Sequence, residues 1–383
     1  MPLSINITSV FLVGALFCWL GKMITSRRLL INSNPLDFLI LLFAAVGAAS
    51  IFASPDKQFS LYNYFHLMGR YLLLYYLIAN NVQTIEQLKR LLMALLCSAL
   101  LVVAYGFFQY FHGVDISAFE WVDQEQFPAL KVRVFSTLGN PNLLAGFLVA
   151  MLAMALGLSI SFDHRQIQLL LFGFIILLVT CLVLTYSRGA WLSAAAVVLF
   201  FGLFGNRKFL WLLLAVPLSI CGQETALERL ISIFHPTDTS ASLRLALWHS
   251  TLAMIADQPW LGIGWGAYWL VYPRYDFFIQ DPSTTIFHAH NMYLNIAAEI
   301  GIPGLLLFLA IWYAHVRLAL TIVTISDNKW VNGTMLGVVG AFVTIAVSGF
   351  TDYLLSNIQF AMLFWLLCGL VVAVREQIMR YSW

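Results

Sequence analysis

Residues 142–162 read NLLAGFLVAMLAMALGLSISF and contain no charged side chain. A helical run of about 20 apolar residues matches the hydrocarbon thickness of a lipid bilayer. The whole chain has this character, because 61% of its 383 residues are hydrophobic and only 10% are charged. A soluble domain carries about 25% charged residues. The composition therefore predicts an all-α protein whose helices span a membrane.

Comparable apolar runs recur on both sides of this stretch. With it, they cover approximately residues 5–24, 36–53, 61–79, 91–111, 142–162, 167–185, 189–204, 208–222, 303–324, 331–350 and 354–374. They predict one polytopic domain over residues 1–383, a transmembrane helical bundle of about 11 spans (11–12). No small-residue cleavage site follows the first run, which we expect to be a span. The net charge of +2 is too small to suggest nucleic acid, and five cysteines without C-x-x-C spacing indicate packing residues.

Basic residues mark one set of connections between the runs. This set holds Arg27, Arg28, Lys89, Arg90, Arg165, Arg207, Lys208, Arg317, Lys329, Arg375 and Arg380, whereas the other connections hold mainly acids, among them Asp56, Asp115, Glu120, Asp123 and Glu125. Connections rich in Lys and Arg face the cytoplasm. The polar stretch 223–290, here called the long loop, is therefore expected on the extracytoplasmic side. With 11 spans the N-terminus would lie there too.

The long loop contains an amphipathic pattern. In Ser242–Asp257, SLRLALWHSTLAMIAD, the residues Leu245, Trp248, Leu252 and Ile255 recur at helical spacing. They predict an amphipathic helix on the membrane surface. Residues 262–266, GIGWG, follow it. No strand precedes these glycines, so they indicate close backbone approach in a tight turn rather than a nucleotide site.

Single charges at the ends of apolar runs are candidates for function, because burying a charge in a membrane costs free energy. Arg188 lies in a very short connection, where an arginine can also extend to lipid phosphates. Arg244 begins the loop helix, where a solvated position is the simplest interpretation. Arg70 and Asp352 are further isolated charges that are either functional or structural hydrogen-bond partners.

The long loop ends in His288-Ala289-His290-Asn291. If a helix begins at His288, then His288, Asn291, Asn295 and Glu299 form one polar stripe that faces a wet cavity. A neutral histidine is suited to general-base catalysis near neutral pH. A His-x-His metal site is less favoured, because no third ligand occurs at a zinc-like spacing.

Four motifs in order resemble the bacterial O-antigen ligase and O-antigen polymerase superfamily, over about residues 133–374. They are Gly139-Asn140-Pro141-Asn142, Tyr186-Ser187-Arg188-Gly189-Ala190-Trp191, Arg244 to Gly264 with its Asp257-x-Pro259-x-x-Gly262-x-Gly264 end, and His290-Asn291 followed by Gly301-Ile302-Pro303-Gly304. The resemblance implies a glycosyltransferase in the bacterial inner (cytoplasmic) membrane, with its site on the periplasmic or extracellular side. Its donor would be a glycan on undecaprenyl diphosphate, and its acceptor a glycan or lipid-linked glycan.

The resemblance also implies roles for individual residues. Arg188 and Arg244 would bind the diphosphate, since a guanidinium binds phosphate through two hydrogen bonds. His290 would accept the proton of the attacking hydroxyl, in an inverting displacement that needs no metal or cofactor. Four further residues are expected to bind or orient substrate: Tyr186, His288, Asn291 and Arg133.

Alternatives stay open at two points. The helical stripe favours His288 as the base, whereas the family signature favours His290, which we prefer. The chain could also be a polymerase of the same superfamily, or a transporter of a small anion such as bicarbonate. A transporter would place its polar groups near the membrane midplane. Their position at the outer ends of the runs favours an enzyme.

Overall fold

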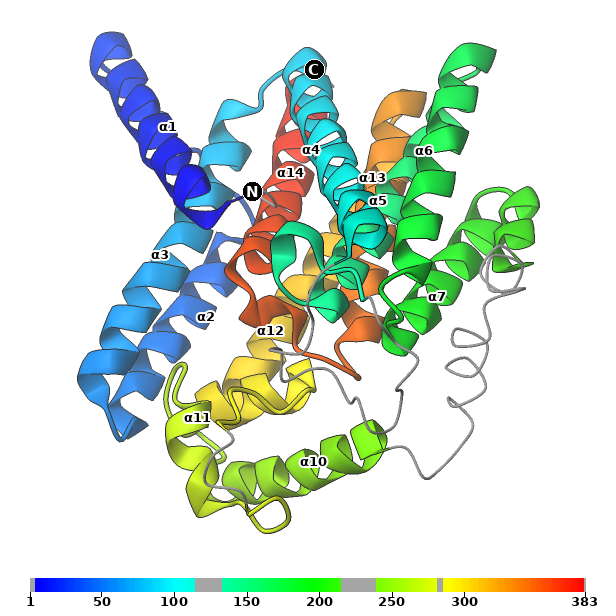
Figure 1. Ribbon diagram of the computed structural model, residues 1–383. Helices are drawn as coiled ribbons and strands as arrows, with labels where there is room; N and C mark the ends of the chain where they lie inside the picture. The colour runs from blue at the N-terminus through cyan, green and yellow to red at the C-terminus, as the bar shows by residue number, and fades with distance from the viewer. Residues whose placement is uncertain (1–3, 114–132, 215–238, 281–284, 382–383) are drawn as a thin grey trace.

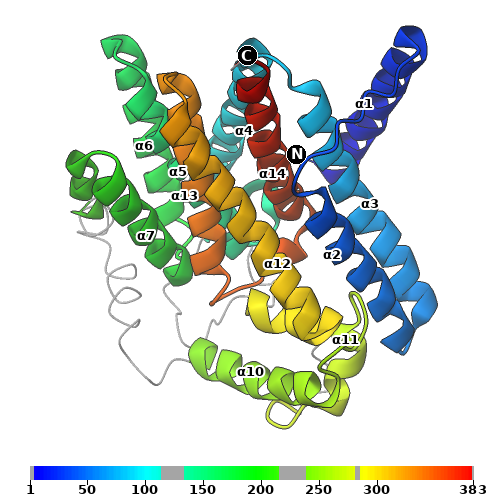
Figure 2. The same cartoon turned by 180° about the vertical axis from the view of Figure 1, so that it is seen from behind.

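The structure is a computed structural model that describes residues 4–113, 133–214, 239–280 and 285–381 (Figures 1 and 2). All regular elements in these ranges are helices, without a β-strand. The main helices are α1 (Ile5–Ser26), α2 (Asp37–Ser50), α3 (Lys57–Asn81), α4 (Ile85–His112), α5 (Pro141–Ser161), α6 (Arg165–Val183), α7 (Arg188–Phe204), α10 (Thr239–Asp257), α11 (Tyr268–Val271), α12 (Met292–Ile325), α13 (Lys329–Ser348) and α14 (Ile358–Tyr381).

The predicted class, an all-α polytopic membrane protein, is confirmed. Seven of the described helices are long and apolar enough to cross a membrane, namely α1, α4, α5, α6, α12, α13 and α14. Helix α2, with its extension to Ala53, and α7 are apolar but shorter, and α3 coincides with the predicted run 61–79. The eighth predicted run begins as a 3-10 helix, Arg207–Leu214, and its remainder lies outside the described residues. The number of spans therefore stays a prediction.

Helix α5 forms the centre of the bundle, because almost all of its side chains are buried. It packs against α13 at glycines. A Cβ atom added at Gly157 would lie 2.3 Å from the carbonyl oxygen of Gly333, and one added at Gly337 would lie 3.0 Å from the Cα of Met154. Small residues let membrane helices approach until their backbones touch, which replaces the hydrophobic driving force that is absent in lipid.

Basic connections gather at one end of the bundle. The ammonium group of Lys89 lies 5.8 Å from the ring centroid of Trp330, and Lys329 Nζ lies 2.6 Å from Asp163 Oδ2. Helices α10 and α11 lie at the opposite end (Figure 1). The charge pattern predicts this separation. The acids Asp115, Glu120, Asp123 and Glu125, which entered that argument, lie outside the described residues.

The predicted helix α10 is present, and the side that it packs on the protein is not the predicted apolar stripe. Leu247 and Met254 are fully buried in a cluster with Ala289 and Ala298. Of the predicted apolar stripe, Leu245 and Leu252 are 53% and 52% exposed. The buried face also contains Ser250 and Thr251. The contact of the apolar stripe with the membrane surface stays a prediction.

We predict that Gly157→Ala lowers the midpoint of thermal unfolding in detergent, because the new methyl group forces α5 and α13 apart. Overpacking of this kind costs roughly 1–3 kcal/mol. Gly173→Ala on α6 is the matched control, since a Cβ atom there meets no atom within 4 Å. Equal midpoints for the two variants would contradict the close contact of α5 and α13.

Topology can be tested with single cysteines in a background without native cysteines. A cysteine at exposed Arg274, beside α11, should react with a membrane-impermeant maleimide added outside spheroplasts. A cysteine at Asp163, whose side chain is 81% exposed at the basic end, should react only after lysis. The reverse pattern would refute the orientation predicted from the charges.

Candidate active site

A kink in α12 creates the framework of the candidate site. Ile300 and Gly301 have non-helical backbone angles, with φ of +75° at Gly301, so the carbonyl groups before them lose their helical partners. Residues 262–266, here called the glycine turn, supply replacements: the N–H of Ile263 donates to Ala298 O at 2.8 Å, and that of Gly264 to Glu299 O at 3.1 Å. The fit requires glycine, because a Cβ atom at Gly301 would lie 2.2 Å from Trp260 O.

The first segment of α12 begins at Met292, with Asn291 as its N-cap. The side chain of Asn291 accepts the N–H groups of Tyr293 and Leu294 at 3.0 and 3.1 Å. The N–H of Met292 donates to Gly349 O at 2.8 Å, which ties this helix start to the end of α13. The polar stripe was predicted from a helix that begins at His288. That helix start is wrong, because His288 lies in irregular backbone before α12.

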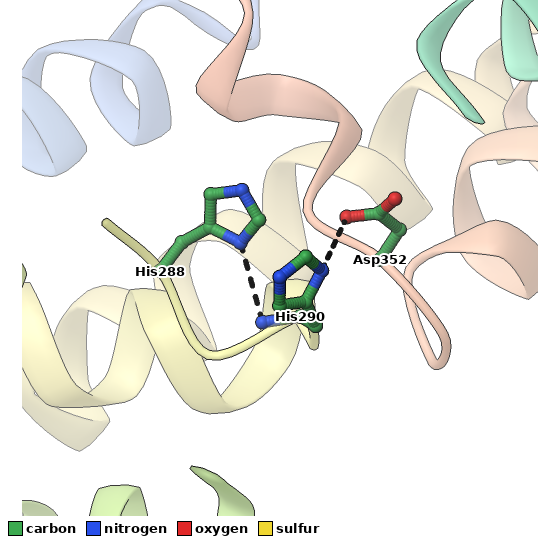
Figure 3. Close-up of side chains that lie close together, drawn as sticks. All are labelled: His288, His290 and Asp352. Carbon is green, nitrogen blue, oxygen red and sulfur yellow. Dashed lines mark hydrogen bonds and ion pairs between the residues drawn. The ribbon is translucent and has the colours of Figure 1, made fainter. Parts of the chain in front are cut away.

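His290 pairs with Asp352 (Figure 3). Its Nδ1 lies 3.3 Å from Asp352 Oδ1. Burial alone would raise the pKa of Asp352, but the hydrogen bond and charge of His290, with a smaller effect of His288, outweigh it and lower that pKa below its usual value. An ionised carboxylate only accepts hydrogen bonds. The proton of neutral His290 thus belongs on Nδ1, and its Nε2 keeps a lone pair.

His288 supports the backbone of its neighbour. The N–H of His290 donates to His288 Nδ1 at 3.3 Å, as Figure 3 shows. Burial, reinforced by the nearby charge of His290, lowers the pKa of His288 to about 4. His288 is therefore neutral at physiological pH. His290 has a φ of +47°, a left-handed conformation that costs free energy in a non-glycine residue and often marks a functional site.

A second group of the predicted residues meets between α6 and α7. Residues 185–189 form a bend, here called the arginine bend, in which Tyr186 has a φ of +54° and Arg188 begins α7. The buried Arg133 fixes it, donating from Nε to Thr185 O at 2.8 Å and from Nη2 to Asn142 Oδ1 at 3.0 Å. Arg133 thus has a structural role here; a role in substrate binding stays a prediction.

The two groups adjoin each other through residues 349–353, the aspartate turn that carries Asp352. A Cβ atom added at Gly189 would lie 2.4 Å from Thr351 Oγ1. The start of α7 therefore packs directly on this turn. Only glycine after Arg188 permits this approach, which explains the Arg-Gly pair of the second motif.

Arg244 approaches from α10. It precedes Leu247 by three residues, and residues at this spacing share one face of a helix. Leu247 packs in one cluster with Ala289, so this face of α10 covers the segment that carries His288 and His290. Figures 1 and 2 agree that α10 begins on the side of α7 and ends beside α11. Arg244, six residues into the helix, lies nearer the end on the side of α7.

Two acidic residues, Asp352 and Glu299, lie at the site although neither belongs to any of the four motifs. Asp352 was only an isolated charge in the sequence, and its partner His290 is 62 residues away. Glu299 lines a cavity of about 480 Å³ together with His288. The sequence signals differed: Asp352 was a lone carboxyl group in an apolar stretch, which is costly unless it has a function or a partner, whereas Glu299 belonged to the polar stripe expected to face a cavity.

Three residues of the site could together hold a metal ion. Potential ligand atoms of His288, His290 and Asp352 all lie within 4.8 Å of one another. The sequence argument against zinc, the lack of a third ligand, therefore fails, because the fold supplies Asp352. Two of these atoms nevertheless already accept backbone hydrogen bonds. His288 Nδ1 accepts the His290 N–H, and Asp352 Oδ1 accepts the Tyr353 N–H at 2.8 Å.

We predict that the site works as a hydrogen-bonded pair without a metal. Glycan transfer should survive EDTA and 1,10-phenanthroline, and elemental analysis of the purified protein should find no stoichiometric transition metal. Asp352→Asn should impair transfer equally with or without added Zn²⁺ or Mn²⁺. Loss of transfer on chelation, restored by one divalent ion, would instead make these three residues metal ligands.

Comparison with known proteins covers the centre of the chain. Residues 172–309 match the family described as O-antigen ligase. An O-antigen ligase of Pseudomonas aeruginosa is 31% identical over 134 residues, which are 34% of this chain and 30% of that relative. The family match contains Arg188, Arg244 and His290. It confirms, over residues 172–309, the resemblance expected from the motifs.

Proposed function

We propose that the protein transfers a glycan from a lipid diphosphate, with undecaprenyl diphosphate as the carrier, to a hydroxyl group of a glycan or lipid-linked glycan acceptor. The observation that carries this proposal is the His290–Asp352 pair, 3.3 Å apart, beside the arginine bend. A base for a hydroxyl and a cation for a phosphate are the two groups that such a transfer requires.

The arginines act on the donor. The bond between the anomeric carbon and the phosphate breaks, and the electron pair leaves with the diphosphate. Fixed positive charge stabilises this developing charge in the transition state. Arg188 approaches from α7 and Arg244 from α10, and each guanidinium can bind phosphate oxygens in a bidentate manner. Since a diphosphate is already a good leaving group, no general acid is needed.

His290 acts on the acceptor. Its Nε2 takes the proton of the hydroxyl group as that oxygen forms the new bond to the anomeric carbon. Asp352 holds the Nδ1 proton and stabilises the imidazolium that results, a role in positioning rather than in proton transfer. Attack opposite the leaving diphosphate inverts the anomeric centre. Asn291 fixes His290 by capping α12, and Tyr186 shapes the bend before Arg188.

The site lies at the end of the bundle opposite the basic connections, which supports an extracytoplasmic location in the inner membrane. A lipid-linked donor can reach such a site by lateral diffusion in the outer leaflet.

Variants of the three proposed catalytic residues test this mechanism in proteoliposomes with a lipid-linked glycan and candidate acceptors. His290→Ala should slow transfer by roughly 10²–10⁴-fold, the usual contribution of a general base, and leave donor binding nearly unchanged. Higher pH should partly restore this variant, since more acceptor alkoxide forms. Arg188→Lys and Arg244→Lys keep the charge but lose the planar fork, so both donor binding and transfer should fall.

Matched controls come from the same loop. His249 on α10 and Arg274 near α11 are exposed, so His249→Ala and Arg274→Lys should transfer at the normal rate. His288→Ala should be milder than His290→Ala. Normal transfer by His290→Ala would show that the base is another group. Solute transport by the wild type, without any release of undecaprenyl diphosphate, would refute the proposed function as a whole.

A further inference from the structure

A cavity of about 480 Å³ adjoins the His290–Asp352 pair on the side away from α7. Its walls come from α2, α3, the glycine turn, the first segment of α12, the residues after Asp352, and α14. His288 is one of the lining residues, and its ring centroid lies 4.3 Å from that of His290. A ligand in this cavity therefore comes within reach of the proposed base. The volume is in the range of small-molecule sites, about 300–1,000 Å³.

The lining combines aromatic rings with a few polar groups. At the outer end, Trp269 contacts Phe59 and Phe287, with ring centroids 5.7 and 6.4 Å apart. Glu299 is the one carboxylate among the described lining residues. The backbone N–H groups of Gly266 and Tyr268 and the side chain of Asn295 bind it. A carboxylate has about four acceptor positions, so this one retains capacity for a ligand.

A second polar group points to the same kind of ligand. Asn63 also lines the cavity, and its side-chain oxygen is buried without a hydrogen-bond partner in the described part of the chain. An unsatisfied buried acceptor costs about 1–3 kcal/mol. Glu299 and Asn63 both offer oxygen atoms, so the matching ligand must bring hydrogen-bond donors.

An isoprenoid chain does not meet this requirement. It would cover Glu299 and Asn63 with hydrocarbon and leave their oxygens unpaired, which is unfavourable. A sugar ring does meet it, since its C–H face can lie on an aromatic ring while its hydroxyl groups donate to oxygen acceptors. The polar groups thus select a sugar over the lipid part of the donor.

The position of the cavity separates acceptor from donor. The start of α7 packs on the aspartate turn, whereas α2 and α3 contribute to the walls of the cavity and α7 does not. Figures 1 and 2 agree that the first segment of α12 lies between α3 and α7. The ring of His290 lies beside that of His288, which lines the cavity, and its partner Asp352 lies on the turn that contacts the start of α7. His290 therefore adjoins both the cavity and the arginine bend, as a base must adjoin both the diphosphate-linked carbon and the attacking hydroxyl.

We propose that this cavity is the subsite for a sugar ring of the acceptor, in which Glu299 and Asn63 bind hydroxyl groups and Trp269 forms the stacking surface. The proposal rests on the proposed function, because it names the acceptor side of the same site. It makes Glu299 a residue that sets acceptor affinity and specificity. The reacting hydroxyl then projects past His288 to His290.

Sugar binding can be measured without any donor. Purified protein in nanodiscs is titrated with methyl β-glucoside, methyl β-galactoside and N-acetylglucosamine, and in a separate arm with farnesol, while tryptophan fluorescence is followed. At least one sugar should change the emission of the wild type, and Glu299→Gln should weaken that binding roughly 10- to 100-fold. Glu86→Gln on α4, whose side chain is 61% exposed, is the matched control and should bind like the wild type.

The aromatic wall gives a second pair of variants, in case Glu299→Gln alters the loop. Trp269→Phe keeps an aromatic face and should retain sugar binding, whereas Trp269→Leu should lose it. Trp211→Phe, at a tryptophan that is 73% exposed outside the cavity, should preserve the fluorescence response. A response to farnesol with none to any sugar would overturn the proposal in favour of an apolar chain.

Transfer kinetics then separate this proposal from the proposed function. Glu299→Gln should raise the KM for the acceptor roughly 10- to 100-fold and leave the KM for the donor unchanged. An unchanged acceptor KM in an active variant, or a raised donor KM instead, would overturn the acceptor subsite alone. A wild type that binds sugar but releases no undecaprenyl diphosphate would refute the proposed function and not the sugar site.

Discussion

The glycine turn and the kink of α12 form the contact on which the candidate site depends. A membrane helix cannot leave carbonyl groups unpaired where water is scarce. At the break, the N–H of Ile302 donates to Pro259 O instead of Ala298 O, and Glu299 O has no helical partner because residue 303 is a proline without an N–H. The N–H groups of Ile263 and Gly264 bind these two carbonyl groups instead. This contact joins the middle of the long loop to α12 and brings the N–H groups of Gly266 and Tyr268 to the side chain of Glu299.

The same contact explains why two distant motifs occur together. Gly262 and Gly264 lie against the backbone of other segments, and Gly301 lies against Trp260 O. At each position a Cβ atom would overlap backbone atoms, so each motif needs the glycines of the other to close. The motifs are thus two halves of one structural joint, and the reactive residues lie just outside it.

Ten of the eleven predicted apolar runs overlap α1–α7 and α12–α14, because lipid imposes length and composition on every crossing helix. The largest difference is at α12, which begins at Met292 instead of residue 303. The motifs also identified His290 and Arg188 as candidates. The sequence could not reveal the pairing of His290 with Asp352, since such contacts depend on tertiary packing across 62 residues. The stripe from His288 failed because capping by Asn291 starts α12 at Met292, which periodicity cannot detect.

The site is built partly from residues that match the O-antigen ligase family and partly from residues outside that match. Residues 172–309, which match the O-antigen ligase family, contain the arginines, His290 and Glu299. Asp352, Asn63 and the cavity walls from α2, α3 and α14 lie outside that range. The reactive groups and the joint that holds them therefore form one continuous part of the chain. The walls of the proposed acceptor cavity combine this part, which supplies Glu299 and Trp269, with Asn63 and other residues of α2, α3 and α14. In our proposal the acceptor site therefore forms only when segments far apart in the sequence pack around the proposed base.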